Sequence, residues 1–378
     1  MSFLWEGIAS VTWQQLVMYL VGAALIWVAI KKEYEPALLL PMGFGAILVN
    51  LPGTNVLNQT LQGVGEVNGI ITWLYEVGIE ASEALPILLF IGIGAMIDFG
   101  PILSKPIFIL FGAAAQLGIF IALIIAALMG YDLNDAASIG IIGAADGPTA
   151  LLVSQVLDSQ FVGPIAVAAY SYMALVPIVQ PMAIKAITTK KERAITMTYE
   201  ANSVSKTTRI LFPIVTTLIV GLIAPSAAAL VGFLMFGNLI RECGVLNTMS
   251  QTAQNELANL ITLLLGITIS FSMQADKFVR ADTLFIMAIG LAAFVFDTFG
   301  GILLAKFMNL FLKQKINPMV GAAGISAFPM ASRVVQRMAQ DENPGTIIIM
   351  QAAGANVAGQ IASAIAGGLI IQLVTSHL

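Results

Sequence analysis

The stretch Gly143-Ala144-Ala145-Asp146-Gly147-Pro148-Thr149-Ala150 interrupts an apolar run that extends from Ala136 to Val156. Pro148 has no backbone N–H and fixes its own φ angle, and Gly147 weakens a helix beside it. The stretch therefore predicts a helix that breaks in mid-course, where backbone carbonyl groups lose their partners. Asp146 adds a carboxylate at the same point.

The composition is that of a membrane protein. Of 378 residues, 58% are apolar and only 10% are charged, with a mean hydropathy of +0.91, whereas soluble chains carry about 25% charged residues. Long apolar runs cover most of the sequence, and no polar segment is long enough to hold a core of its own. We expect an all-α polytopic membrane protein without a soluble domain.

The same composition limits the chemistry of a metal site. Cys243 and His377 are the single cysteine and the single histidine of the chain. This excludes a disulfide framework or a cysteine cluster, and it disfavours zinc and haem. A cation bound here would be a hard one that is held by oxygen atoms.

The broken run and the membrane setting together point to a cation site. Opened backbone at membrane depth survives only where it is buried in protein or lines a wet cavity. A carboxylate there costs about 2.5–3.5 kcal/mol on insertion scales, so a functional role is the default reading. We expect Asp146 to bind a cation near the middle of the membrane. The alternative is a structural hydrogen bond from Asp146 to freed backbone amides.

Twelve apolar segments follow one another along the chain, and several are shorter than the roughly 20 residues that a crossing needs. The chain also repeats itself, because residues 143–155 resemble residues 321–333. We therefore expect an N-terminal membrane repeat (1–187), a cytoplasmic linker (188–207) and a C-terminal repeat (208–378). The segments are 12–30, 37–51, 84–97, 106–129, 136–157, 163–187, 208–224, 227–240, 257–275, 283–307, 318–338 and 345–373.

Positive charges decide the expected topology, since Lys and Arg gather on the cytoplasmic side. If all twelve segments cross, the 17 Lys and Arg split 7 inside and 10 outside. If segments 136–157 and 318–338 are re-entrant, all but Lys277 and Arg280 face the cytoplasm. Each half then has five crossings, so the two repeats are inverted and the tips of the two broken hairpins meet. Corresponding interrupted segments in two halves indicate a transporter site.

Two polar stretches allow two readings each. The cluster Lys190-Lys191-Glu192-Arg193 in the linker either docks a soluble partner or only sets topology. The outer loop, about 51–83, contains four glutamates and neither Lys nor Arg. It either gathers cations or is simply solvated.

A sodium ion suits one carboxylate together with hydroxyl, amide and carbonyl oxygens. Asp146 and Thr149 supply such groups in the first hairpin, and Asn317 and Ser326 supply them in the second. Asn356 adds an amide in a helix of small residues, which let backbones approach closely. Hairpin capping is the alternative for Asn317 and Ser326, and an interhelical hydrogen bond is the alternative for Asn356.

Three further residues are candidates. Tyr172 could relay a proton or bind a ligand, or it could be a packed tyrosine with a satisfied hydroxyl. Arg333 could attract a carboxylate from the cytosol through bidentate hydrogen bonds, or it could anchor the hairpin at the interface. Asp297 stands inside an apolar segment and is a second cation or proton candidate.

At these residues the chain resembles the β subunit of sodium-translocating biotin-dependent decarboxylases, which include the oxaloacetate, methylmalonyl-CoA, glutaconyl-CoA and malonate enzymes. The resemblance runs from about residue 30 to the C-terminus. Three small departures are Ala144, where many members have glycine, Ala355, where many have proline, and Asp297, where an uncharged residue is expected. The motifs that carry it lie at 143–150, 170–177, 236–244 and 317–333.

The resemblance implies the membrane subunit of a primary sodium pump, a translocase in the bacterial inner (cytoplasmic) membrane. Its partners would be a carboxyltransferase α subunit, a biotin carrier protein, a small γ or δ membrane subunit and further β copies, with no nucleic acid. The β subunit would decarboxylate carboxybiotin held by the separate carrier, consume a proton and export Na⁺. The resemblance gives Asp146 the central sodium and proton role, places Asn356 beside the ion, and makes Tyr172, Asn317, Gly321, Ser326 and Arg333 functional.

Two other functions fit the residues less completely. A secondary sodium/proton antiporter would have the same inverted repeats. A non-catalytic membrane anchor would not need a midplane carboxylate. No Met-Lys-Met biotin attachment site occurs in this chain, so a pump of this kind needs its carrier on another subunit.

Overall fold

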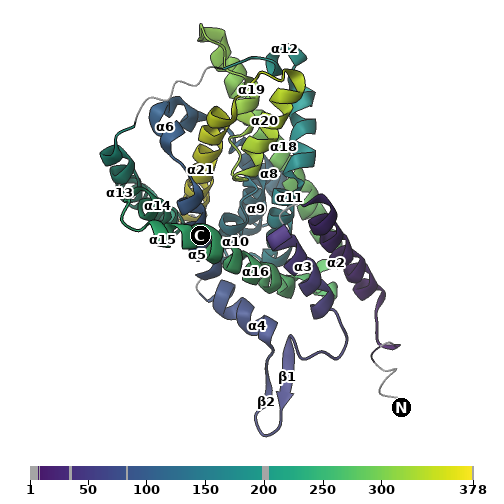
Figure 1. Ribbon diagram of the computed structural model, residues 1–378. Helices are drawn as coiled ribbons and strands as arrows, with labels where there is room; N and C mark the ends of the chain where they lie inside the picture. The colour runs from purple at the N-terminus through teal and green to yellow at the C-terminus, as the bar shows by residue number, and fades with distance from the viewer. Residues whose placement is uncertain (1–6, 8, 34–35, 82–83, 198–203, 377–378) are drawn as a thin grey trace.

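The computed structural model describes residues 7, 9–33, 36–81, 84–197 and 204–376, the side chain of Ala174 excepted. Most of the described chain is helical (Figure 1), which confirms the expected all-α class. The elements of the first half are α2 (Trp13–Lys32), α3 (Pro36–Val49), β1 (Asn58–Leu61), β2 (Gly65–Asn68), α4 (Ile70–Tyr75), η1 (Glu76–Glu80), α5 (Ala84–Met96), α6 (Gly100–Ser104), η2 (Pro106–Phe108), α7 (Ile109–Ala114), α8 (Leu117–Leu128), α9 (Leu133–Gly140), η3 (Ile141–Ala144), α10 (Gly147–Val156) and α11 (Val162–Ile187).

The linker contains the short helix α12 (Lys190–Arg193), which a Thr189/Glu192 capping box begins. The elements that follow are α13 (Lys206–Ile223), η4 (Pro225–Ala227), α14 (Ala228–Glu242), α15 (Asn247–Thr252), η5 (Ala253–Leu257), α16 (Ala258–Ile269), η6 (Ser270–Met273), α17 (Ala275–Phe278), α18 (Ala281–Phe311), α19 (Pro318–Ala322), α20 (Met330–Glu342) and α21 (Ile349–Thr375).

Each expected apolar segment contains helix, but fewer helices than expected are long enough to cross a membrane alone. Among the described residues six helices pass on length and composition, or eight if each of two bent pairs is one span. The ten crossings stay a prediction, since α3 has 14 residues and α14 has 15, too few to pass this length criterion. Helices this short span only part of a hydrocarbon core about 30 Å thick.

The surface fits a lipid environment. Helix α13 exposes a row of large apolar side chains that includes Leu218, Leu222 and Ile223, exposed by 61%, 83% and 66%. Contiguous apolar surface of this kind marks contact with a membrane or with another subunit.

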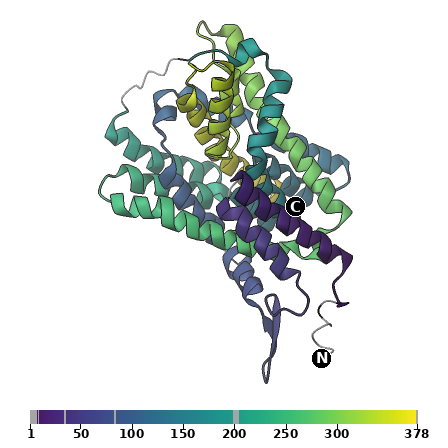
Figure 2. The same ribbon diagram turned by 45° about the vertical axis from the view of Figure 1, so that its right-hand side comes forward.

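One small element was not expected. Strands β1 and β2 form an antiparallel hairpin within the loop 51–83, and the hairpin projects from one end of the molecule (Figure 1). Gly63 in its turn and Gly65 at the start of β2 have φ angles of 82° and 99°, which favour glycine. Helices α12 and α19 lie at the opposite end, and Figure 2 shows the same arrangement.

Helices of each half pack against helices of the other half. The contact of α3 with α16 corresponds to that of α14 with α5. The contact of α11 with α18 corresponds to that of α21 with α7, and the contact of α10 with α21 corresponds to that of α20 with α11. In each case a contact has a counterpart with the halves swapped, which is what two related repeats would produce. The inverted orientation of the repeats stays a prediction.

Candidate functional site

The first hairpin breaks at Ala145 and Asp146. Helix α9 continues into the 3₁₀ turn η3, and Ala145 then adopts a left-handed conformation with φ 51° and ψ 42°. Asp146 is extended, with φ −122° and ψ 95°, and forms the N-cap of α10. A non-glycine residue in the left-handed region is unfavourable by about 1–2 kcal/mol, so the surrounding packing holds this break in place.

The carboxylate of Asp146 is buried, with 3% of the residue exposed. Its Oδ2 accepts hydrogen bonds from Thr149 Oγ1 at 2.7 Å, Ser363 Oγ at 2.7 Å and Gln360 Nε2 at 3.1 Å. Its Oδ1 has only a long contact of 3.5 Å with the backbone N–H of Thr149. One oxygen is therefore saturated by donors, and the other keeps lone pairs that could bind a cation.

The second hairpin meets the first at this point. Helix α19 ends at Ala322, and the chain then turns through residues 323–329 before α20. The backbone N–H of Ser326 in this turn donates to the carbonyl of Ala144 at 3.2 Å, and Ser326 Oγ donates to the carbonyl of Gly359 at 3.0 Å. The two breaks are thus hydrogen-bonded to each other, two residues before Asp146.

Helix α21 completes the cluster with one polar face. Asn356, Gln360 and Ser363 are spaced i, i+4 and i+7, which aligns them along one side of a helix. Asn356 Nδ2 donates to the carbonyl of Ile325 at 2.6 Å, while its Oδ1 is buried without a hydrogen-bond partner among the described residues. A Cβ on Gly359 would collide with the carbonyl of Gly324, so α21 approaches the second break as closely as backbone allows.

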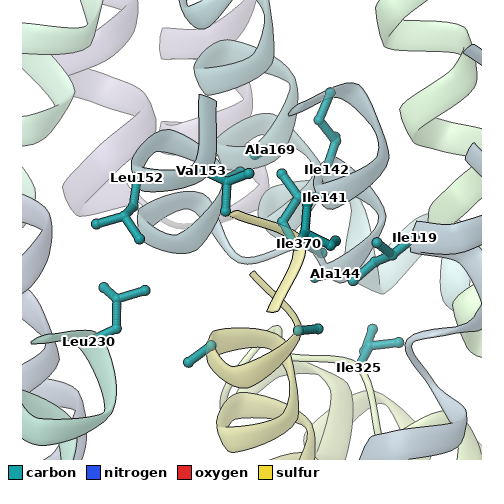
Figure 3. Packing of buried hydrophobic residues seen from close by; sticks show 14 of the residues in the cluster. Ile119, Ile141, Ile142, Ala144, Leu152, Val153, Ala169, Leu230, Ile325 and Ile370 are labelled. Atoms are coloured by element: carbon teal, nitrogen blue, oxygen red, sulfur yellow. The ribbon is translucent and has the colours of Figure 1, made fainter. Parts of the chain in front are cut away.

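Buried apolar residues flank both breaks in the chain. Ile141, Ile142 and Ala144 from η3 belong to the same hydrophobic cluster as Ile325 from the second break and Ile119 from α8 (Figure 3). A buried carboxylate in such surroundings would be costly alone. The cluster would offer a cation one formal negative charge, hydroxyl and amide oxygens, and the carbonyls at the two breaks. This set of oxygen ligands suits a dehydrated hard cation.

The structure does not bring Asn317 to this cluster. Asn317 is the N-cap of α19, where its Oδ1 accepts from the N–H of Met319 at 3.0 Å. Its Nδ2 donates to the carbonyls of Arg193 and Ile195 in the linker, at 2.8 and 2.9 Å. The side chain thus has the capping contact that was the alternative to a ligand role.

The two tyrosines of α11 have different surroundings. The hydroxyl of Tyr172 donates to the carbonyl of Met287 in α18. The ring of Tyr170 packs on Gly147, where an added Cβ would collide with it, and its hydroxyl is buried without a partner among the described residues. Tyr170 is therefore the tyrosine that touches the residue next to Asp146, and Tyr172 ties α11 to α18.

Arg333 and Asp297 lie outside the cluster. Arg333 is exposed on the first turn of α20 and takes part in no ion pair within the described parts of the chain. Asp297 is fully buried in α18, and its Oδ1 accepts from the backbone N–H of Gly118 where α8 begins. Its Oδ2 is unpartnered within the described chain and lies 3.1 Å from the position of a Cβ on Gly143.

Comparison with known protein families shows which family the chain belongs to. The family model described as the Na⁺-transporting oxaloacetate decarboxylase beta subunit matches residues 14–374. The chain belongs to this family of β subunits. The match covers both broken hairpins and α21, so every residue of the cluster lies inside it.

Relatives from this family are similar to the chain over nearly their whole length. The chain is 45% identical over 384 residues to methylmalonyl-CoA decarboxylase subunit beta of Propionigenium modestum, which covers 97% of this chain and 96% of that protein. It is 44% identical over 369 residues to glutaconyl-CoA decarboxylase subunit beta of Acidaminococcus fermentans, covering 98% and 96%. It is 41% identical over 413 residues to the oxaloacetate decarboxylase beta chain of Klebsiella pneumoniae, covering 95% of each. The family is one of sodium-transporting subunits, which favours the pump over the antiporter.

Two side chains that contact Asp146 were not identified from the sequence. Gln360 and Ser363 contact Asp146 directly, and neither was a candidate. The available signal was their spacing, because both continue the helical face that Asn356 begins. In a helix of glycine and alanine this face also fits simple interhelical packing, and spacing alone does not separate the two.

Proposed function

We propose that this β subunit is the membrane subunit of a primary sodium pump and that Na⁺ binds beside Asp146. The observation that carries the proposal is the meeting of the two hairpin breaks at a buried carboxylate, with Ser326 on Ala144 and Ser363 on Asp146. The proposed ligands are Asp146, Thr149, Ser326 and Asn356, to which the structure adds Ser363. Gln360 would hold the carboxylate in place.

The remaining candidates act at other points. Asn317 would act through the linker rather than as a ligand, because its amide is engaged there. Exposed Arg333 would attract a carboxylate from the cytosol, since a guanidinium binds carboxylates through two parallel hydrogen bonds. Tyr172 would contribute by holding α11 on α18, and Asp146 would take up a proton when Na⁺ leaves.

Carboxybiotin on a separate carrier would supply the driving reaction, the loss of carbon dioxide from its carboxylate. This chain's part is to admit the carboxylate near Arg333 and to exclude water from it. It must also hold Na⁺ until protonation of Asp146 weakens the site. Moving one charge outward against 100 mV costs about 2.3 kcal/mol.

The proposed partners are a carboxyltransferase α subunit, a biotin carrier, a small γ or δ membrane subunit and further copies of the β subunit. The proposed location is the bacterial cytoplasmic membrane. The family description supports a multi-subunit decarboxylase, and the apolar helices support a multi-pass protein.

The test is sodium-22 uptake into inverted vesicles that contain the purified complex. We expect uptake that requires the acyl substrate and stops when avidin blocks biotin. Uptake that an imposed pH gradient drives alone, indifferent to avidin, would instead establish an antiporter.

A further inference from the structure

A second hollow lies at the end of the molecule that carries α12 and α19, away from Asp146. It has a volume of about 870 Å³. Three segments form its walls: the junction of α6 and η2, α12 with the linker that follows it, and the connection between α18 and α19. Figure 1 shows α12 and α19 side by side at this end, opposite the β1–β2 hairpin.

The hollow carries uncompensated positive charge. Lys105, Lys191, Lys313 and Lys315 line it, and none of the described lining residues is acidic. The ion pairs of the described chain involve none of these four lysines. Such a concentration of one sign attracts anions and raises their local concentration.

Nearby acids are already neutralised by other cations. Glu192 pairs with Lys306 at 2.9 Å, and Glu342 pairs with Arg193 at 2.6 Å. Both carboxylates are therefore committed to holding the linker against α18 and α20. Lys315 Nζ donates to the carbonyl of Asn309, but no carboxylate of the described chain neutralises any of the four lysines, so their charge can serve an anion from outside the chain.

The rest of the lining narrows the chemistry of that anion. Ile107, Phe108 and Leu312 give apolar walls, while Thr196 and Gln314 give neutral hydrogen-bonding groups. Apolar rings would pack on the walls, a urea would bond to the hydroxyl and the amide, and a carboxylate would lie among the lysines. We propose that this lysine pocket receives the carboxylated biotin arm of the soluble carrier. The inference rests on the proposed function and names where the biotin arm first binds, before its carboxylate reaches Arg333.

The pocket wall is connected to the second hairpin. Asn317 holds the linker wall through the carbonyls of Arg193 and Ile195, and its own N–H contacts Met197 Sδ at 3.4 Å. Asn317 also begins α19, whose following turn places Ser326 on Ala144. A ligand in the pocket would therefore contact the linker wall that Asn317 connects to α19 and to the turn that carries Ser326.

The experiment compares two charge-matched double variants of the β subunit, each in the full complex in liposomes. Lys191→Gln/Lys313→Gln removes two exposed lysines that line the pocket, and Lys185→Gln/Lys190→Gln removes two exposed lysines that do not. The probe is carrier protein with carbon-14 in its carboxybiotin, and the readout is the rate of labelled carbon dioxide release against carrier concentration.

For Lys191→Gln/Lys313→Gln we expect KM to rise roughly fivefold to tenfold with kcat unchanged, as loss of two attractive contacts predicts. Added salt should raise the wild-type KM more than the variant KM. For Lys185→Gln/Lys190→Gln we expect KM within about twofold of wild type.

Three results would overturn the pocket. KM could stay unchanged in Lys191→Gln/Lys313→Gln. It could also rise equally in both double variants, which would show that the carrier is attracted by the overall positive charge and not by the pocket. The effect could also vanish in liposomes without anionic lipid, which would make the pocket a headgroup site. Failure of the proposed function is a separate result, since wild-type protein would then release no carbon dioxide from the carrier at all.

Discussion

At the scale of single residues, Asp146 combines burial with an uneven set of partners. Three side-chain donors converge on its Oδ2, and its Oδ1 keeps only one long contact. Donors to one oxygen stabilise the ionised carboxylate, and the other oxygen is left for a cation. Asn356 Oδ1 is a second buried acceptor without a partner in the described chain.

Ser363→Ala should weaken sodium binding roughly tenfold, since a hydrogen bond to a charged group contributes about 1.5–3 kcal/mol. The measurement is the sodium concentration that gives half-maximal substrate-driven uptake. Ser154→Ala is the matched control, because Ser154 is also buried but its hydroxyl bonds only to Leu151 within α10. Equal effects of the two changes would remove Ser363 from the site.

Tyr170→Phe and Tyr172→Phe should differ in stability. A buried hydroxyl without a partner is a cost, so its removal from Tyr170 should leave the free energy of unfolding unchanged or raise it by up to about 1 kcal/mol. Removal from Tyr172 loses the bond to Met287 and should lower it by about 1 kcal/mol. Thermal unfolding in detergent measures both, and equal losses would mean that Tyr170 has a bonded hydroxyl.

At the scale of elements, the site depends on helices that stop. The left-handed residue Ala145 turns the first hairpin, and the turn at 323–329 separates α19 from α20. Each stop frees backbone groups, and Ala144 and Ser326 use two of them to join the breaks.

Ala145→Val should lower the free energy of unfolding by about 1–3 kcal/mol, because a β-branched residue resists the left-handed conformation. Ala145→Gly should cost nothing or stabilise the protein, since glycine adopts positive φ freely. Denaturation of the two variants in one detergent tests this. A Val variant as stable as the Gly variant would show that the break does not need this conformation.

The linker should loosen in acid. Partial burial alone would raise the pKa of Glu192, but bonds from the backbone and hydroxyl of Thr189 and from Lys306 outweigh it and lower the pKa. Stability from a lowered pKa is present above the ordinary value of 4.5 and is lost as pH falls through the folded-state value. Hydrogen exchange of residues 188–197, corrected for intrinsic rates, should therefore speed up at about pH 3.5 relative to pH 6 in wild type. In Glu192→Gln it should not change, and a pH response there would contradict this cause.

The sequence was informative where one local property decides the structure. Long apolar runs located the segments that became helices, and the Gly and Pro residues around Asp146 located the first break. The direction in which each side chain of a helix points was harder to predict. Tyr170 and Tyr172 lie two positions apart on a helix, about 200° around its axis, so only packing shows which one meets Gly147. Gln360 and Ser363 were missed for the same reason.

At the scale of the whole molecule, the exchanged packing of the two halves brings both breaks and α21 to one point. Four lysines line the pocket at the end with α12 and α19. The chain thus separates the place where an anion would arrive from the place where Na⁺ would bind, and α19 connects them.

The most direct test of this account is equilibrium binding of sodium-22 to the purified β subunit. Asp146→Asn should weaken binding at least about tenfold, because it removes the formal charge of the site. Asp297→Asn makes the same change at the fully buried aspartate of α18 and should leave affinity within about twofold, since an amide oxygen can still accept from Gly118. Wild-type affinity in Asp146→Asn, or an equal loss in Asp297→Asn, would contradict a sodium site at the crossed hairpins.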